Sequence, residues 1–140
     1  MADGIKIEIV SPERLVLSQQ ASAVSVPGME GYFTVMGDHA PLMTTLKPGF
    51  VTVTLSDGAQ TYYVRGGFAD VSPEGITILA EEAKTGADFD RSEIEAAITI
   101  AREELGGAET PEAKSTAQMT LDGWSNLLLE AASINVGSLH

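Results

Sequence analysis

The sequence predicts a β-sandwich of about ten short antiparallel strands, followed by an antiparallel two-helix hairpin at the C-terminus. As far as about residue 86, runs of four to seven residues alternate apolar and polar side chains, and Gly, Pro, Asp or Ser separates them. Beyond about residue 88, apolar residues recur every three or four positions, as on one face of a helix. We therefore expect a sandwich domain at 1–86 and a helical hairpin at 87–140. A parallel sheet would need crossover helices between its strands, and the first part of the chain shows no such stretches.

The clearest strand pattern lies at residues 4–10, where Ile5, Ile7 and Ile9 alternate with Lys6 and Glu8. Further strands are expected around residues 15–17, 21–26, 51–55, 61–64, 68–71 and 76–79. Asp57-Gly58 between two alternating runs predicts a tight hairpin in which both turn residues have positive φ. Gly66-Gly67 predicts a break or bulge before the next strand.

The helical half begins with Asp90 and Glu93, which are spaced as in a capping box. Gly106-Gly107 is expected to stop the first helix, and Thr110 to cap the second. Small and apolar residues on each helix predict the stripe that packs against the other. They are Ile94, Ala97, Ile98, Ala101 and Leu105 on the first helix, and Ala117, Leu121, Trp124, Leu128 and Ala131 on the second.

Composition narrows the function. The chain has 140 residues and a formal net charge of −12, which disfavours nucleic acid as a partner and adhesion to anionic lipid. No apolar run is long enough to cross a bilayer, and the N-terminus lacks a signal-peptide layout, so no direct lipid insertion is expected. We expect a cytoplasmic protein, or one docked on a partner at a membrane.

The sequence offers little for catalysis. Of two histidines, His140 ends the chain and is expected to fray, and His39 has neither a second metal ligand nor a nucleophile spaced near it. We predict no catalytic residues, no metal site and no cofactor. The apolar residues on the turn-rich segment at 26–49 are more informative, because exposed together they would form a docking patch. They are Met29, Tyr32, Phe33, Met36, Leu42 and Met43.

Three segments carry a resemblance to a known family: VPGMEGYFTVMGDHAPLMTTLKPG at 26–49, RGGFADV at 65–71 and ITILAEEA at 76–83. Together they resemble the epsilon subunit of the F-type rotary ATP synthase, called delta in mitochondria. The resemblance implies a non-catalytic rotor subunit of the central stalk. It would contact gamma and the c-ring, couple ring rotation to ATP synthesis, and lie peripherally on the cytoplasmic face of the inner membrane. It also implies a c-ring interface made by Met29, Glu30, Gly31, Tyr32, His39, Ala40, Pro41 and Leu42.

Two alternatives stay open. In many relatives the helical hairpin inhibits ATP hydrolysis by inserting into the catalytic head, and some relatives bind ATP through an (Ile/Leu)-Asp-x-x-Arg-Ala motif. At the matching positions this chain retains Asp90 but has Glu93 in place of the arginine, so no ATP binding is expected. The other alternative is a small hydrolase built around His39.

Overall fold

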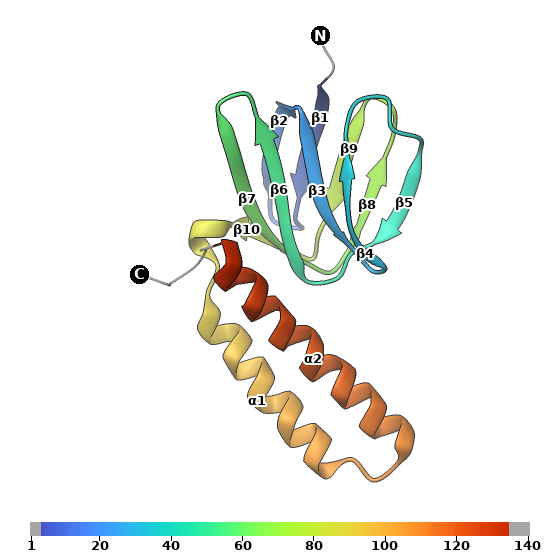
Figure 1. Ribbon diagram of the computed structural model, residues 1–140, viewed down its shortest axis with the longest axis vertical. Coiled ribbons are helices and arrows are strands. Elements are labelled where there is room, and N and C mark those ends of the chain that lie inside the picture. The colour runs from blue at the N-terminus through green and yellow to red at the C-terminus, as the bar shows by residue number, and fades with distance from the viewer. Residues whose placement is uncertain (1–3, 135–140) are drawn as a thin grey trace. The chain divides into compact units, whose positions relative to one another are not determined.

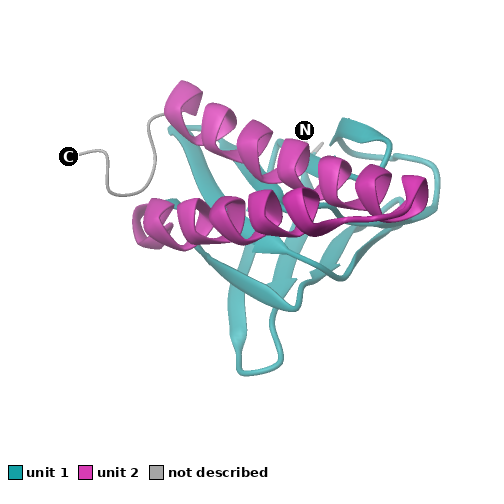
Figure 2. Ribbon diagram, turned by 90° about the horizontal axis from the view of Figure 1, so that it is seen from below, with its two compact units in different colours: residues 1–86 teal, residues 87–140 magenta. Residues whose placement is uncertain are grey.

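The structure is a computed structural model that describes residues 4–134 of the chain. The chain divides into two compact units, residues 1–86 and 87–140, which Figure 2 shows in different colours. His140, expected to fray, lies outside the described residues.

The first unit is a sandwich of two five-stranded sheets (Figure 1), which confirms the predicted fold class. The first sheet has the order β2 (Leu15–Ala21), β1 (Ile5–Val10), β9 (Gly75–Leu79), β8 (Phe68–Val71) and β5 (Leu42–Thr45). The second has the order β10 (Glu82–Thr85), β7 (Gly58–Arg65), β6 (Gly49–Leu55), β3 (Ala23–Gly28) and β4 (Gly31–Val35).

Strand pairing differs from the expectation in one place. β1 lies between β2 and β9, and it runs antiparallel to β2 but parallel to β9. Between β1 and β9 the chain also forms strands of the other sheet, so the two strands are paired without being joined by a hairpin. The local alternation that predicts each strand carries no information on the direction of a partner so distant in sequence.

The hairpin between β6 and β7 is confirmed, but its turn is one residue earlier than predicted. Leu55 pairs with Gly58, which leaves Ser56 and Asp57 as the turn residues. Only Gly58 has a positive φ, of 141°. The glycine is therefore needed where the chain enters β7, and Asp57 keeps an ordinary backbone conformation.

The core lies between the two sheets and consists of the inward residues of alternating strands. The isoleucines of β1 all belong to it, as their period of two predicts. The other large aliphatic members are Val24, Val26, Val35, Leu46, Val51, Val53, Val64, Val71, Ile76 and Ile78. A continuous apolar core of this kind makes the sandwich a stiff support for its loops.

Gly67 lets the chain pass from the second sheet into the first. It has φ of 90°, and a Cβ built on it would lie 1.8 Å from the carbonyl oxygen of Leu79. Its own carbonyl accepts a hydrogen bond from the Leu46 amide, at 3.0 Å. The predicted break at Gly66-Gly67 is therefore confirmed, and at Gly67 no other residue fits.

The second unit contains a helical hairpin of α1 (Arg91–Gly107) and α2 (Pro111–Ile134). A short 3₁₀ turn, η1 (Gly86–Asp88), spans the boundary between the two units. Asp90 caps α1, as predicted, and the Thr110 hydroxyl accepts from the Ala113 amide at the start of α2. Leu127 is buried although the predicted stripe omitted it, which widens the apolar face of α2 on one side. Within residues 4–134, neither helix is long and apolar enough to span a bilayer.

Candidate docking surface

The two segments of the predicted c-ring interface, Met29–Tyr32 and His39–Leu42, both lie at edge strands of the sandwich. β4 is an edge of the second sheet and β5 an edge of the first, and the chain connects them through residues 36–41. An isolated bridge between Gly28, at the end of β3, and Leu46, just after β5, links the two sheets next to these edges. We call this side the edge surface; it comprises Met29, Glu30, Gly31, Tyr32, Met36, His39, Ala40, Pro41, Leu42 and Met43.

The β3–β4 turn forms one end of the edge surface. Gly31 has φ of 134°, which lets the chain reverse with Met29 and Glu30 at its tip. The Met29 amide donates a 2.9 Å hydrogen bond to the Thr45 carbonyl, so the turn is fixed to β5 although its side chains are exposed. An apolar side chain is thus presented to solvent on a rigid backbone.

The side chain of Tyr32, unlike the exposed side chains of the β3–β4 turn, is held by contacts within the sandwich. Its hydroxyl accepts a hydrogen bond from the Phe50 amide at 3.0 Å, and the Lys47 ammonium lies 5.3 Å from its ring centroid. A Cβ at Gly49 would lie 2.6 Å from that hydroxyl, so the glycine makes room for it. Tyr32 therefore joins β4 to β6 in addition to lying partly exposed on the edge surface.

The connection between β4 and β5 forms the other end of the edge surface. Asp38 has φ of 61°, and its amide donates to the Pro73 carbonyl at 3.3 Å, which ties the connection to the β8–β9 turn. His39 is half-buried, and its Nδ1 lies 2.8 Å from the Ala40 carbonyl oxygen, to which it donates. Pro41, like Ala40 before it, is exposed.

The eight predicted interface residues therefore do not form one compact patch. Figure 1 shows the β3–β4 turn and the β4–β5 connection at opposite ends of the strands. The five residues of β4 separate them by roughly 13 Å, at about 3.3 Å per residue. A partner that lies along the edge contacts both groups, whereas a partner at one end contacts only one.

Sequence reasoning missed a second exposed apolar surface, on the outer face of the first sheet. The register aligns Leu15 with Val10, Val10 with Leu79, and Leu79 with Phe68. These four side chains form one row across β2, β1, β9 and β8, which we call the outer row; Val10 is half-buried and the other three are exposed. Alternation within each strand could have placed each residue outward, but only the pairing shows that they are neighbours.

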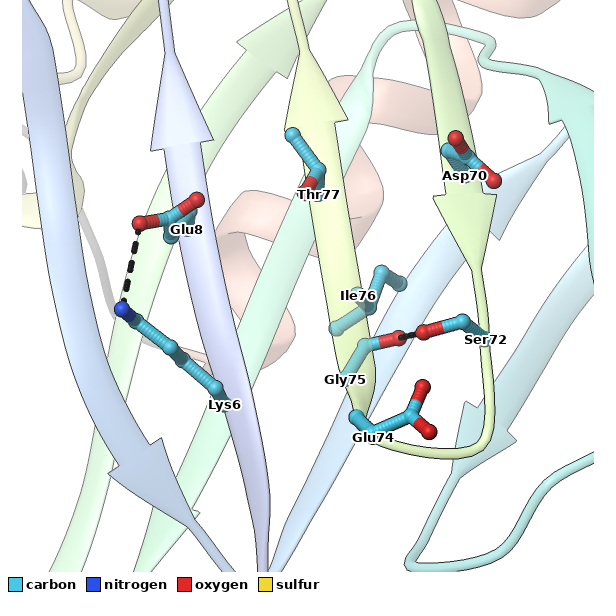
Figure 3. Close-up of a pocket in the computed structure, with 8 residues that line it drawn as sticks. All are labelled: Lys6, Glu8, Asp70, Ser72, Glu74, Gly75, Ile76 and Thr77. Atoms are coloured by element: carbon cyan, nitrogen blue, oxygen red, sulfur yellow. Dashed lines mark hydrogen bonds and ion pairs between the residues drawn. The ribbon is translucent and has the colours of Figure 1, made fainter.

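A shallow groove of about 210 Å³ lies on the same sheet (Figure 3). Lys6 and Glu8 form an ion pair of 3.5 Å at one side, and Asp70 and Glu74 lie across from it. Within residues 4–134, neither Asp70 nor Glu74 forms an ion pair. The outer face of the first sheet is therefore apolar along the outer row and carries two carboxylates away from it, Asp70 on β8 and Glu74 in the β8–β9 turn.

Among residues 4–134, no group of three or more His, Asp or Glu side chains is placed to hold a metal ion. Burial raises the pKa of Tyr62 above the usual 10.0. Its hydroxyl donates to Gln60 Oε1 at 2.9 Å, within the sandwich.

The positions that match the ATP-binding motif lie at the start of α1. Asp90 Oδ1 accepts from the Ser92 amide at 2.9 Å and from the Ser92 hydroxyl at 2.6 Å. The Glu93 side chain is exposed in the first helical turn. The retained aspartate is thus already used as the helix cap, and the neighbouring carboxylate adds negative charge.

Comparison with known proteins gives consistent matches. The family described as "ATP synthase, Delta/Epsilon chain, beta-sandwich domain" matches residues 4–86. A protein of Mesorhizobium japonicum named "ATP synthase epsilon chain" is 48% identical over 128 residues, which cover 91% of this chain and 95% of the relative. A Brucella anthropi protein of the same name is 47% identical over 122 residues, covering 86% and 90%.

Two solved structures share the fold. The first, from the Euglena gracilis mitochondrial ATP synthase (OSCP/F1/c-ring), has a TM-score of 0.73 and 23% identity, covering 92% of this chain and 81% of that one. The second, from the Tetrahymena thermophila mitochondrial ATP synthase (central stalk/c-ring), has a TM-score of 0.59 and 16% identity, covering 87% and 94%. At these identities the likeness shows the fold alone.

Proposed function

Because this chain belongs to the delta/epsilon-chain family of ATP synthases, we propose that it is a non-catalytic rotor subunit that joins the c-ring to gamma in the central stalk. The observation that carries the proposal is the presence of two separate apolar surfaces on one stiff sandwich. A subunit that transmits rotation must hold two partners at once without bending between them.

The edge surface suits the c-ring. Its exposed apolar side chains stand on backbone that is tied to the scaffold at both ends, by Met29 to Thr45 and by Asp38 to Pro73. Burying such side chains against a partner is favourable, and a fixed backbone loses little entropy on docking. Since the two groups lie at opposite ends, the proposed contact runs along β4 and β5.

The outer row suits gamma. It crosses four paired strands, with a register shift between Ile9 and Val10, so it offers an apolar strip on a sheet rather than on a loop. The carboxylate of Asp70, two positions along β8 from Phe68, favours a partner that carries Lys or Arg next to its own apolar strip. Both partners would then be held on neighbouring sides of the same sandwich.

We assign no reaction to this chain. His39 uses Nδ1 for the Ala40 carbonyl, and its place in the β4–β5 connection fits an interface residue. The proposed location follows from the partners: a peripheral subunit on the cytoplasmic face of the inner membrane, held there by the c-ring.

Reconstitution tests the proposal. Membranes whose ATP synthase lacks this chain should regain proton-driven ATP synthesis when the purified protein is added, and the tagged protein should co-purify with gamma and the c-ring. Recovery of neither partner, or synthesis that is unchanged by the addition, would overturn the proposal.

A regulatory role is the second candidate, and one observation favours it. Ile100, Met119 and Leu129 are exposed on the helical hairpin, so a catalytic head that bound the hairpin would bury apolar side chains. If the hairpin inhibits hydrolysis, an Ile100→Asp, Leu129→Asp double variant should raise the ATPase rate of the reconstituted complex. An unchanged rate would dismiss this role.

A further inference from the structure

The methionines of this protein are concentrated on the proposed docking surface. The exposed fractions are 59% for Met29, 58% for Met36 and 64% for Met43, and all three belong to the edge surface. The remaining described methionine, Met119, is 71% exposed on α2. Met1 lies outside the described residues.

Exposure decides how a methionine responds to oxidants. A peroxide reaches an exposed thioether readily, whereas a thioether in a core is shielded. The chain has no cysteine, so no thiol competes for the oxidant. None of the three edge methionines belongs to the core cluster, so their oxidation leaves the packing of the sandwich unchanged.

We propose that Met29, Met36 and Met43 form an oxidation-sensitive site, and that conversion of their thioethers to sulfoxides weakens docking along the edge surface. In this step the peroxide O–O bond breaks and an S–O bond forms. The sulfur loses two electrons, and hydrogen peroxide is reduced to water. The inference rests on the proposed function, because it assumes that the edge surface is buried against a partner.

The energetic argument concerns the change in polarity. A thioether on a docking surface gains by leaving water, whereas a sulfoxide carries a strong hydrogen-bond acceptor that needs a partner once it is buried. Three such groups lie along one edge, so a partner that covers the edge must desolvate more than one of them. Docking in turn shields the thioethers, so the assembled subunit should resist oxidation.

The test compares oxidation with binding in the full-length protein. The purified chain is treated with hydrogen peroxide, sulfoxides are located by peptide mass spectrometry, and rebinding to ATP synthase that lacks this subunit is measured. We expect affinity to fall about tenfold or more, which is 1.4 kcal/mol or more. Methionine sulfoxide reductases A and B together, one for each sulfoxide epimer, should restore it, and circular dichroism should show an unchanged fold.

Matched variants make the result specific. A triple Met29→Leu, Met36→Leu, Met43→Leu variant keeps apolar volume and should bind normally after peroxide, whereas Met119→Leu should remain sensitive. In the assembled complex, Met119 should oxidise faster than the edge methionines.

Two outcomes separate the inference from the proposed function. If Met29→Asp weakens rebinding but peroxide does not, the oxidation-sensitive site is wrong and the docking surface stands. If Met29→Asp and Met36→Asp both bind normally, the docking surface itself is wrong.

Discussion

The backbone amide of Met29 donates a 2.9 Å hydrogen bond to the carbonyl oxygen of Thr45. This contact joins a turn of the second sheet to the edge strand of the first, and it fixes the position of an exposed apolar side chain. The side chain of Met29 can therefore be changed without disturbing the bond that holds its backbone, which makes the turn a clean place to separate docking from folding.

Substituting aspartate at either end of the edge surface tests docking. Met29→Asp and Met36→Asp each place a charge where an apolar contact is proposed, so association with the c-ring should weaken about tenfold or more. The free energy of unfolding should change by less than about 0.5 kcal/mol, because both side chains are exposed. Binding by the reconstituted complex and thermal unfolding measure the two quantities.

Met119→Asp is the matched control, since it makes the same change at an exposed methionine of α2. It should leave docking along the edge unaltered. If only one of the two edge variants weakens binding, the ring contacts one end of the surface and the partner does not run along β4 and β5.

The Tyr32 hydroxyl contributes to stability rather than to docking. Tyr32→Phe keeps the ring over which Lys47 lies but removes the acceptor for the Phe50 amide. An N–H left without its partner costs about 1–2 kcal/mol, which should appear as a lower midpoint in urea. An unchanged midpoint would mean that water replaces the hydroxyl.

The sheet-to-sheet passage at Gly67 should not tolerate a side chain. Gly67→Ala combines an unfavourable positive φ with a Cβ 1.8 Å from the Leu79 carbonyl oxygen, so we expect a loss above about 3 kcal/mol or no folded protein. Gly123→Ala is the opposite case, because its Cβ meets nothing within 4 Å inside α2 and should stabilise by about 0.5–1 kcal/mol. Denaturant titration of both variants checks the contrast.

Features that depend on neighbouring residues in the sequence could be predicted, whereas features that depend on residues distant in the sequence could not. Alternation at Ile5, Ile7 and Ile9 correctly gave the buried face of β1, because burial within a strand is local. The parallel pairing of β1 with β9 was not predictable, since about seventy residues separate Ile7 from Ile76. The outer row was not predicted for the same reason. Its four residues become neighbours only through strand pairing; they are Leu15, Val10, Leu79 and Phe68.

The predicted interface residues show a different limit of sequence-based prediction. The resemblance implied that Met29–Tyr32 and His39–Leu42 both belong to a c-ring interface. β4 runs between them, however, and an extended strand of five residues carries its ends to opposite ends of the edge surface. Likewise, Tyr32 has an exposed ring but an anchored hydroxyl, and nothing in the sequence links it to Phe50.

Tyr62 should limit stability at high pH. Burial raises its pKa above 10.0 in the folded chain, so the neutral phenol stabilises the fold fully below pH 10. This stabilisation is lost as the pH rises through the raised pKa, because the unfolded chain ionises more readily. Between pH 9 and pH 11 the melting temperature of wild type should therefore fall more steeply than that of Tyr62→Phe. Parallel curves of melting temperature against pH would contradict the assignment.

ATP should not bind at the start of α1. Asp90 Oδ1 is already engaged by both the amide and the hydroxyl of Ser92, and exposed Glu93 places a carboxylate where a triphosphate would need a cation. The Glu93 carboxylate would repel the negatively charged phosphates of ATP, so millimolar ATP should leave the melting temperature of the isolated chain unchanged. Glu93→Arg reverses the charge at the matching position of the motif and is the informative partner variant. If ATP raises the melting temperature of the variant but not of wild type, Glu93 alone accounts for the loss of binding. If ATP raises the melting temperature of wild type, the charge argument fails and the regulatory candidate gains support.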